Sequence, residues 1–236
     1  MAHTPTVEAI DLGKSYGDVI VLKHVSFSAK PGESIAFTSP SGSGKSTMLS
    51  MVGLLLTPTT GDVAIDGMRA STLDDERLSA LRRETFGFVF QHTQLIGSLR
   101  AWENVTVPAR FMGKDAPDAE KRADELLERF GLADKRDNYP FQLSVGQKRR
   151  VALARALMLD PPVLIADEPT NDLDAESADS VTRALFEHVE MGGTLLYATH
   201  DPELSARADH LMRLEGKTFV EDGGRSESDR SAAGAR

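Results

Sequence analysis

One glycine-rich stretch constrains the fold of this chain more than any other feature: residues 39–47 read Ser39-Pro40-Ser41-Gly42-Ser43-Gly44-Lys45-Ser46-Thr47. An apolar run at 34–38 comes before it and predicts a buried strand, and residues 48–53 come after it and predict the opening of a helix. This order of elements is typical of a loop that binds nucleotide phosphates. The alternative, a Gly/Ser-rich surface loop, is disfavoured because Gly-Lys-Ser-Thr comes so soon after a strand.

The residue types in this loop fit the binding of a nucleotide with Mg²⁺. Gly42 and Gly44 allow a tight turn with inward-pointing N–H groups, and the start of the helix adds unpaired donors. In such loops the lysine, here Lys45, reaches the β- and γ-phosphates, and the next hydroxyl, here Ser46, ligates Mg²⁺. The usual pattern begins with a glycine where this chain has Ser39. We therefore expect strain at the loop entry, since a left-handed non-glycine residue costs about 1–2 kcal/mol.

Composition excludes several classes of protein. The chain has 236 residues and contains no apolar run of about 18 residues, so no membrane-spanning helix is expected. Residues 1–5 lack the features of a signal peptide, and the absence of cysteine excludes disulfides and thiolate metal sites, which fits a cytosolic protein. The net charge of −9 argues against a large nucleic-acid surface, so no nucleic-acid partner is expected.

The order of the elements predicts an α/β fold. Short apolar runs alternate with helical patterns, which indicates a mostly parallel sheet buried on both faces. A turn near Gly17-Asp18 separates the first two strands. We predict strands at 6–12, 21–28, 34–38, 63–67, 86–90, 163–166, 194–198 and 209–214, and helices at 74–83 and 175–190, with a short helix opening at Pro202.

Residues 92–158 contain no strand signal and predict a helical insertion, with helices at 102–113, 118–130 and 145–158. We therefore expect one domain over residues 1–222, with a nucleotide-binding core at 1–91 and 159–222 and a helical subdomain at 92–158. The remaining segment, 223–236, is rich in Gly, Ser, Ala and Arg without an apolar face and is expected to be disordered.

A second phosphate-site element follows the strand Val163-Leu164-Ile165-Ala166, where Asp167 and Glu168 emerge at the carboxyl end. Open α/β sheets bind ligands at that end of their strands. Asp167 is placed to hold Mg²⁺ through water, and Glu168 is placed to polarise an attacking water. A strand followed by an acidic turn is the alternative, and the phosphate loop in the same chain favours the functional interpretation.

The most specific motif is Leu143-Ser144-Val145-Gly146-Gln147, followed by Lys148-Arg149-Arg150-Val151-Ala152-Leu153-Ala154-Arg155-Ala156-Leu157. It resembles the signature segment of ABC-type ATPases, and the resemblance extends from about residue 6 to residue 220. The resemblance implies a P-loop NTPase fold with N-terminal antiparallel strands. It also implies that the protein binds ATP with Mg²⁺. The usual form is Leu-Ser-Gly-Gly-Gln. Val145 replaces the first glycine, and we expect a β-branched residue there to resist a positive φ and to hinder approach to a partner's ATP.

The resemblance also assigns roles. Tyr16 stacks on adenine, Gln91 reaches Mg²⁺ and the attacking water, and His200 contacts the γ-phosphate beside the catalytic Glu168. Residues 39–47 and 144–147 bind nucleotide, and Ser46, Gln91 and Asp167 form the metal site. The segment 171–174 crosses the interface of a dimer.

Each role has a structural alternative. In these alternatives, Tyr16 would only cover a strand edge, Gln91 would be a solvated loop residue, and His200 would be a structural histidine. The basic run 148–150 is predicted to be a solvated face rather than a nucleic-acid site, because it is short and the protein is acidic.

The resemblance implies the ATP-hydrolysing subunit of a bacterial ABC transporter. It would pair head to tail with a second ATPase subunit, either a copy or a paralogue. It would drive separate integral membrane permease subunits from the inner, cytoplasmic face of the cell membrane. Residues 88–91 and 103–105 resemble the lipoprotein-release and macrolide-exporter branch, which acts on lipids, peptides or drugs.

Three alternatives remain open. One is a cell-division or peptidoglycan-regulating ATPase that signals through a membrane partner. Another is a soluble ABC protein of DNA repair or translation, which the single cassette without a heptad run disfavours. The third is a module that binds ATP without turnover, or with weakened hydrolysis, because of Ser39 and Val145.

Overall fold

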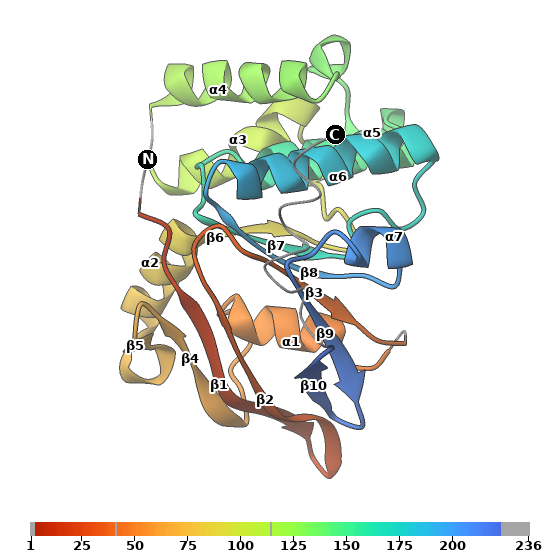
Figure 1. Cartoon of the computed structure of the whole chain (residues 1–236). Helices are drawn as coiled ribbons and strands as arrows, with labels where there is room; N and C mark the ends of the chain where they lie inside the picture. Colours follow the sequence, from red (N-terminus) through yellow and green to blue (C-terminus); the bar gives the residue numbers. More distant parts are fainter. Residues whose placement is uncertain (1–2, 41, 114, 223–236) are drawn as a thin grey trace.

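The structure is a computed structural model that describes residues 3–40, 42–113 and 115–222. Its centre is a six-stranded sheet in the order β10-β9-β3-β8-β7-β6 (Figure 1). The β9 and β10 strands pair antiparallel, and the other neighbours pair parallel. The strands are β3 (Ser34–Thr38), β6 (Phe86–Val89), β7 (Val163–Asp167), β8 (Thr194–Ala198), β9 (His210–Glu215) and β10 (Thr218–Glu221).

A second, antiparallel sheet has the order β2-β1-β4-β5 and lies at the lower left of Figure 1. It consists of β1 (Val7–Tyr16), β2 (Val19–Ala29), β4 (Thr60–Ile65) and β5 (Met68–Arg69). Helix α1 (Lys45–Val52) packs between the two sheets, because it contacts β7 and β8 on one side and β1 on the other.

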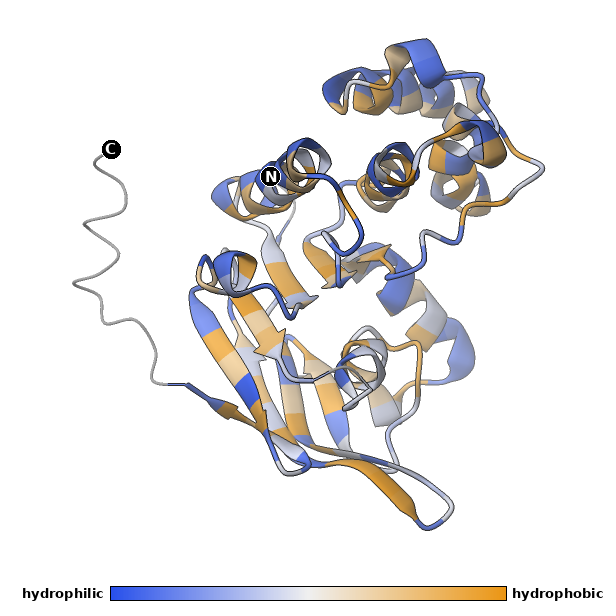
Figure 2. Ribbon diagram, turned by 90° about the vertical axis from the view of Figure 1, so that its right-hand side faces the viewer, coloured by the Kyte–Doolittle hydropathy of each residue, from blue (hydrophilic) through white to orange (hydrophobic). Residues whose placement is uncertain are grey.

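The central sheet is buried on both faces, as a strand in a parallel sheet usually is. Alternate residues of β3 belong to different core clusters: Ile35 and Phe37 pack toward α1 and the antiparallel sheet, and Ala36 packs toward the helices on the other face. The same period of two separates Val163 from Leu164 in β7. In Figure 2 the interior strands are largely orange and therefore hydrophobic.

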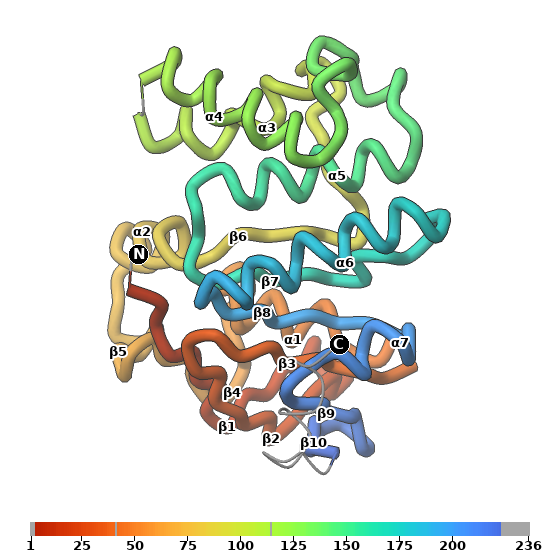
Figure 3. Tube along the Cα trace, turned by 45° about the horizontal axis from the view of Figure 1, so that its top comes forward, coloured from red at the N-terminus to blue at the C-terminus, as the bar shows by residue number. Residues whose placement is uncertain are grey.

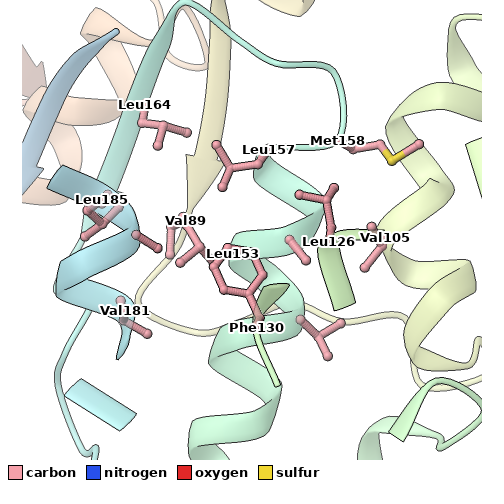
Figure 4. Close-up of a cluster of buried hydrophobic side chains, with 14 of the residues drawn as sticks. Val89, Val105, Leu126, Phe130, Leu153, Leu157, Met158, Leu164, Val181 and Leu185 are labelled. Carbon is pink, nitrogen blue, oxygen red and sulfur yellow. The ribbon is translucent and has the colours of Figure 1, made fainter. Parts of the chain in front are cut away.

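Helices cover the second face of the sheet. The layer next to it holds α5 (Val145–Ala156) and α6 (Ala175–Glu190), and α3 (Ala101–Phe111) and α4 (Ala116–Arg129) lie beyond α5 (Figure 3). A single hydrophobic cluster joins these layers, in which Leu153 of α5 lies among residues of the strands and the outer helices (Figure 4). Helix α5 is therefore the element through which the insertion contacts the sheet.

The remaining elements are short or lie at the margins: α2 (Asp75–Thr85), α7 (Pro202–Ser205), and the 3₁₀ turns η1 (Ala70–Thr72), η2 (Ala133–Lys135) and η3 (Pro140–Gln142). Within the described ranges, every helix is too short or too polar to cross a lipid bilayer.

The predicted α/β fold is confirmed, with its mostly parallel sheet, N-terminal antiparallel strands and helical insertion. The sequence did not predict β5 and β10, which are short edge strands, and the phosphate helix begins at Lys45 rather than at Met48. The disorder predicted for 223–236 lies outside the described residues.

Candidate functional site

Four neighbouring parallel strands end at one edge of the central sheet, and a predicted site segment follows each of them. The phosphate loop follows β3, Gln91 comes soon after β6, Glu168 follows β7, and His200 comes soon after β8. The Glu168 N–H donates to the Ala198 carbonyl at 2.9 Å, so two of these loops are bonded directly. A cavity of about 400 Å³ opens there, lined by Val21, Gly42, Ser43, Gly44, Lys45, Ser46, Thr47, Gln91, Asp167 and Glu168.

The phosphate loop turns through two left-handed glycines. Gly42 has φ 74° and Gly44 has φ 111°, and Gly44 is the N-cap of α1. A Cβ on Gly44 would lie 3.0 Å from a methyl group of Val21, so this position also requires a glycine for close packing on β2. The cavity lies at the N-terminal end of α1, where the first N–H groups have no partner within the helix and favour an anion. Ser41 lies outside the described residues.

The strain expected at Ser39 is absent, because Ser39 is not among the non-glycine residues with positive φ. Its hydroxyl instead hydrogen-bonds the Ser43 hydroxyl, which in turn donates to the Pro40 carbonyl at 2.6 Å. The Ser39 carbonyl accepts a hydrogen bond from the Lys45 ammonium at 2.7 Å. Ser39 therefore takes part in the internal bonding of the loop, and the expectation of a left-handed entry was wrong.

Glu168 lies between two basic side chains. One carboxylate oxygen is 3.2 Å from the Lys45 ammonium. The other is 2.8 Å from Nδ1 of His200 and accepts the His200 backbone N–H at 3.2 Å. The Lys45 and Glu168 side chains are almost fully buried, whereas that of His200 is 57% exposed. His200 therefore contacts the buried Glu168 carboxylate while much of its own side chain faces solvent, and it is not among the residues that line the cavity.

Asp167 and Ser46 fit a Mg²⁺ site. The Asp167 Oδ1 atom is buried and has no hydrogen-bond partner among the described residues. Burial raises the pKa of the Asp167 carboxyl above its ordinary value of 3.8, and a hydrogen bond from Ser46 acts against that rise. In the described part of the chain, no group of three or more His, Asp or Glu side chains is arranged so that it could hold a metal ion by itself. This fits Mg²⁺, which proteins usually bind through only one or two carboxylates together with the phosphates of the substrate.

Gln91 lines the same cavity with an exposed side chain, so the structure brings it together with Asp167 and Glu168. Tyr16 lies at the end of β1, is 55% exposed and does not line this cavity. The Lys14 ammonium lies 5.2 Å from the centre of the Tyr16 ring. The stacking of Tyr16 on adenine stays a prediction.

The signature segment lies outside the 400 Å³ cavity. Ser144 caps α5: its hydroxyl accepts the Gln147 N–H at 3.2 Å, and its own N–H donates to the Gln147 side chain at 2.9 Å. Val145 is the first helical residue and has no positive φ, so the backbone strain expected there was also wrong. The Val145 side chain is 54% exposed, and Gly146 packs against Ser177 of α6.

The basic run 148–150 is not the solvated face that the sequence predicted. Arg149 is only 3% exposed, and Lys148 and Arg150 are half-buried. Sequence reasoning missed Arg149 because a charged run at a helix start normally faces water.

The segment 171–174 was predicted to cross a dimer interface. Asp172 is exposed with φ 61°, and Asp174 caps α6 by accepting the Ser177 N–H at 2.9 Å. The role of this segment at an interface stays a prediction.

Comparison with known proteins gives one consistent result. A family model described as ABC transporter matches residues 22–171. The macrolide export ATP-binding/permease protein MacB of Escherichia coli K12 is 42% identical over 221 residues, which is 92% of this chain and 34% of that protein. The pyoverdine export ATP-binding/permease protein PvdT of Pseudomonas fluorescens Pf0-1 is 42% identical over 225 residues, 93% of this chain and 34% of that protein. The chain thus spans about a third of the length of these relatives.

Two solved structures of the cassette MJ0796 share the fold. The first is described as the dimeric structure of a bacterial ABC transporter cassette; it has a TM-score of 0.87 and 36% identity, over 93% of this chain and 99% of that one. The second is described as a dimeric post-hydrolysis state bound to ADP and Pi; it has a TM-score of 0.87 and 37% identity over the same shares. The relatives agree with the predicted macrolide-exporter branch.

Proposed function

The chain belongs to the ABC transporter family, and from that premise we propose that it binds and hydrolyses ATP to drive an export permease in the cell membrane. The observation that carries the proposal is the convergence of the Lys45, Gln91, Asp167 and Glu168 segments on one cavity, together with the contact between His200 and Glu168. The four loops come from adjacent parallel strands, so their relative positions are fixed by the sheet.

Each side chain has a role in this proposal. Lys45 and the N–H groups at the start of α1 bind the phosphates of ATP. Ser46, Asp167 and Gln91 would hold Mg²⁺, which neutralises phosphate charge when it is bound. Glu168 accepts a proton from the attacking water, and His200 orients that carboxylate through its Nδ1 contact of 2.8 Å.

The remaining predicted residues support a composite site. Ser144 and Val145 are exposed at the start of α5, away from the chain's own phosphate cavity. We propose that Ser144–Gln147 meet the nucleotide of a second ATPase subunit, and that Tyr16 stacks on adenine. A two-fold pair then contains two equivalent sites. The cassette MJ0796 is described as dimeric, which supports this arrangement.

The permease would lie on the helical subdomain, residues 92–158, and the nucleotide core would comprise residues 1–91 and 159–222. The printed names of MacB and PvdT, export ATP-binding/permease proteins, support an export permease as the partner. In the proposed assembly, the chain would lie at the cytoplasmic face of the cell membrane.

The test is Mg²⁺-dependent ATP turnover by wild type, Glu168→Gln and Glu203→Gln. Removal of a general base costs on the order of 10²–10⁴ in rate, so the Glu168 variant should be nearly inactive and should elute as a dimer with ATP bound. Glu203 is an exposed carboxylate on the short helix α7, and its variant should keep the wild-type rate. Turnover that survives in Glu168→Gln would remove Glu168 from its role, and an inactive wild type would contradict hydrolysis.

A further inference from the structure

Arg149 joins three functional segments that are far apart in the sequence. It lies in the second turn of α5, and only 3% of it is exposed. Its Nη1 donates to the carbonyls of Phe90 and Gln91, both at 2.7 Å, and its Nη2 lies 3.4 Å from the carbonyl of Asn171. A planar guanidinium can hold several acceptors in fixed directions, which a flexible ammonium cannot do.

The acceptors of Arg149 belong to the catalytic loops. The carbonyl of Gln91 belongs to the residue whose side chain lines the phosphate cavity. The Asn171 N–H donates to the Glu168 carbonyl at 3.2 Å, so Arg149 is two hydrogen bonds from the main chain of Glu168. Burial lowers the pKa of Arg149, and the negative charges of Asp172 and Asp167 act against that fall.

We propose that Arg149 is a positioning residue that holds Gln91 and the segment at Asn171 in one fixed arrangement relative to the signature helix α5. This inference rests on the proposed function for its effect on turnover, but its structural effect can be measured without nucleotide. The proposed contact of Ser144–Gln147 with a partner's ATP would then move α5, Gln91 and Asn171 together.

A second arginine on the same helix provides a matched comparison. Arg155 donates to the carbonyls of Gln94 and Thr93, at 2.9 and 2.8 Å, a few residues beyond Gln91 in the same loop. No hydrogen bond joins Arg155 to the 168–174 segment among the described residues. Arg155 therefore fixes one loop to α5, whereas Arg149 fixes two.

The first experiment is hydrogen–deuterium exchange of the nucleotide-free protein, comparing wild type, Arg149→Lys, Arg149→Gln and Arg155→Gln. If the proposal is right, exchange rises in peptides that cover 88–96 and 168–175 in both Arg149 variants, and only in 88–96 in the Arg155 variant. A rise across the β1–β4 sheet as well would show a general loss of structure and would overturn a specific role, as would unchanged exchange at 168–175.

The second experiment combines Arg149→Lys with Gln91→Ala and measures turnover and nucleotide affinity with and without Mg²⁺. Misplaced catalytic groups cost up to about 10²-fold, so kcat of the Arg149 variant should fall on the order of 10-fold or more with KM nearly unchanged. In the Gln91→Ala background the Arg149 change should add less than about 3-fold, because the Gln91 side chain that Arg149 positions through the main-chain carbonyl is then absent. Independent, multiplicative losses would overturn the proposal.

The affinity measurement separates the two proposals. If the wild type does not hydrolyse ATP, the proposed hydrolysis fails. The role of Arg149 is then judged from the gain in ATP affinity that Mg²⁺ provides. A smaller gain in Arg149→Lys than in wild type and Arg155→Gln supports positioning, and an equal gain overturns it.

Discussion

The Lys45 ammonium lies 3.2 Å from a carboxylate oxygen of Glu168, and the two side chains are only 6% and 9% exposed. The same lysine donates to the Ser39 carbonyl, and the other oxygen of Glu168 contacts His200. The residue proposed to bind phosphate is therefore paired with the residue proposed to act as base. Binding of a phosphate would draw Lys45 away and leave Glu168 to His200 and water.

Lys45→Met should destabilise the nucleotide-free protein. It leaves the buried carboxylate of Glu168 without its cation, and breaking one side of a buried ion pair costs about 3 kcal/mol or more. Urea denaturation without nucleotide measures the change in the free energy of unfolding. The double variant Lys45→Met/Glu168→Gln removes both charges and should recover at least half of the loss. A single variant as stable as the wild type would show that the pair contributes nothing.

Asp167→Asn should stabilise the nucleotide-free protein at neutral pH and abolish Mg²⁺-dependent turnover. Burial raises the pKa of Asp167 above 3.8, so the folded protein holds this proton to a higher pH than the unfolded chain does. Ionisation of Asp167 therefore lowers stability as the pH rises through the folded pKa, and below pH 3.8 the cost is absent.

Denaturation of wild type and Asp167→Asn at a series of pH values tests this sign. The advantage of the asparagine variant should be present at pH 7 and should shrink as the pH falls toward 4. The matched control is Asp179→Asn, because Asp179 is exposed on α6. Asp201 is less suitable, because its side chain caps α7. An asparagine variant that is less stable than the wild type at pH 7 would contradict the argument.

Ser39→Gly should lower stability slightly rather than raise it. Ser39 has no left-handed strain to relieve, and its hydroxyl bonds to Ser43. Glycine also adds freedom to the unfolded chain, which costs about 0.4–1 kcal/mol. The free energy of unfolding of the two proteins decides this, and a stabilised glycine variant would mean that the serine is strained after all.

The sequence predicts the site better than it predicts what supports the site. Asp167 and Glu168 could be placed because they come at the end of a continuous apolar run, and Lys45 because it belongs to a glycine-rich loop that follows another such run; parallel strands end at a common edge. The backbone conformations of Ser39 and Val145 could not be predicted, since a motif gives residue types and not φ angles. The φ values show that neither position is left-handed.

Arg149 is the clearest case that the sequence could not resolve. The run of three basic residues has the composition of a solvated face, and its burial depends on two loops that approach α5 from about 20 and 60 residues away. Such contacts have no local signature. The edge strand β10 was missed because it is only four residues long and, among the described residues, β9 is the one strand it pairs with.

Gly146→Ala should destabilise the contact between α5 and α6. A Cβ at position 146 would lie 2.3 Å from the Ser177 hydroxyl and 2.9 Å from its Cβ, so one helix must shift. Overpacking of this kind costs about 1–3 kcal/mol, which a thermal or urea denaturation measures. Gly97→Ala is the matched control, because no atom lies within 4 Å of the added Cβ and the residue has no positive φ. In a Ser177→Gly background, the alanine at 146 has room, so its cost should fall by more than half relative to Ser177→Gly alone. An equal cost in both backgrounds would place the strain elsewhere than at the start of these two helices.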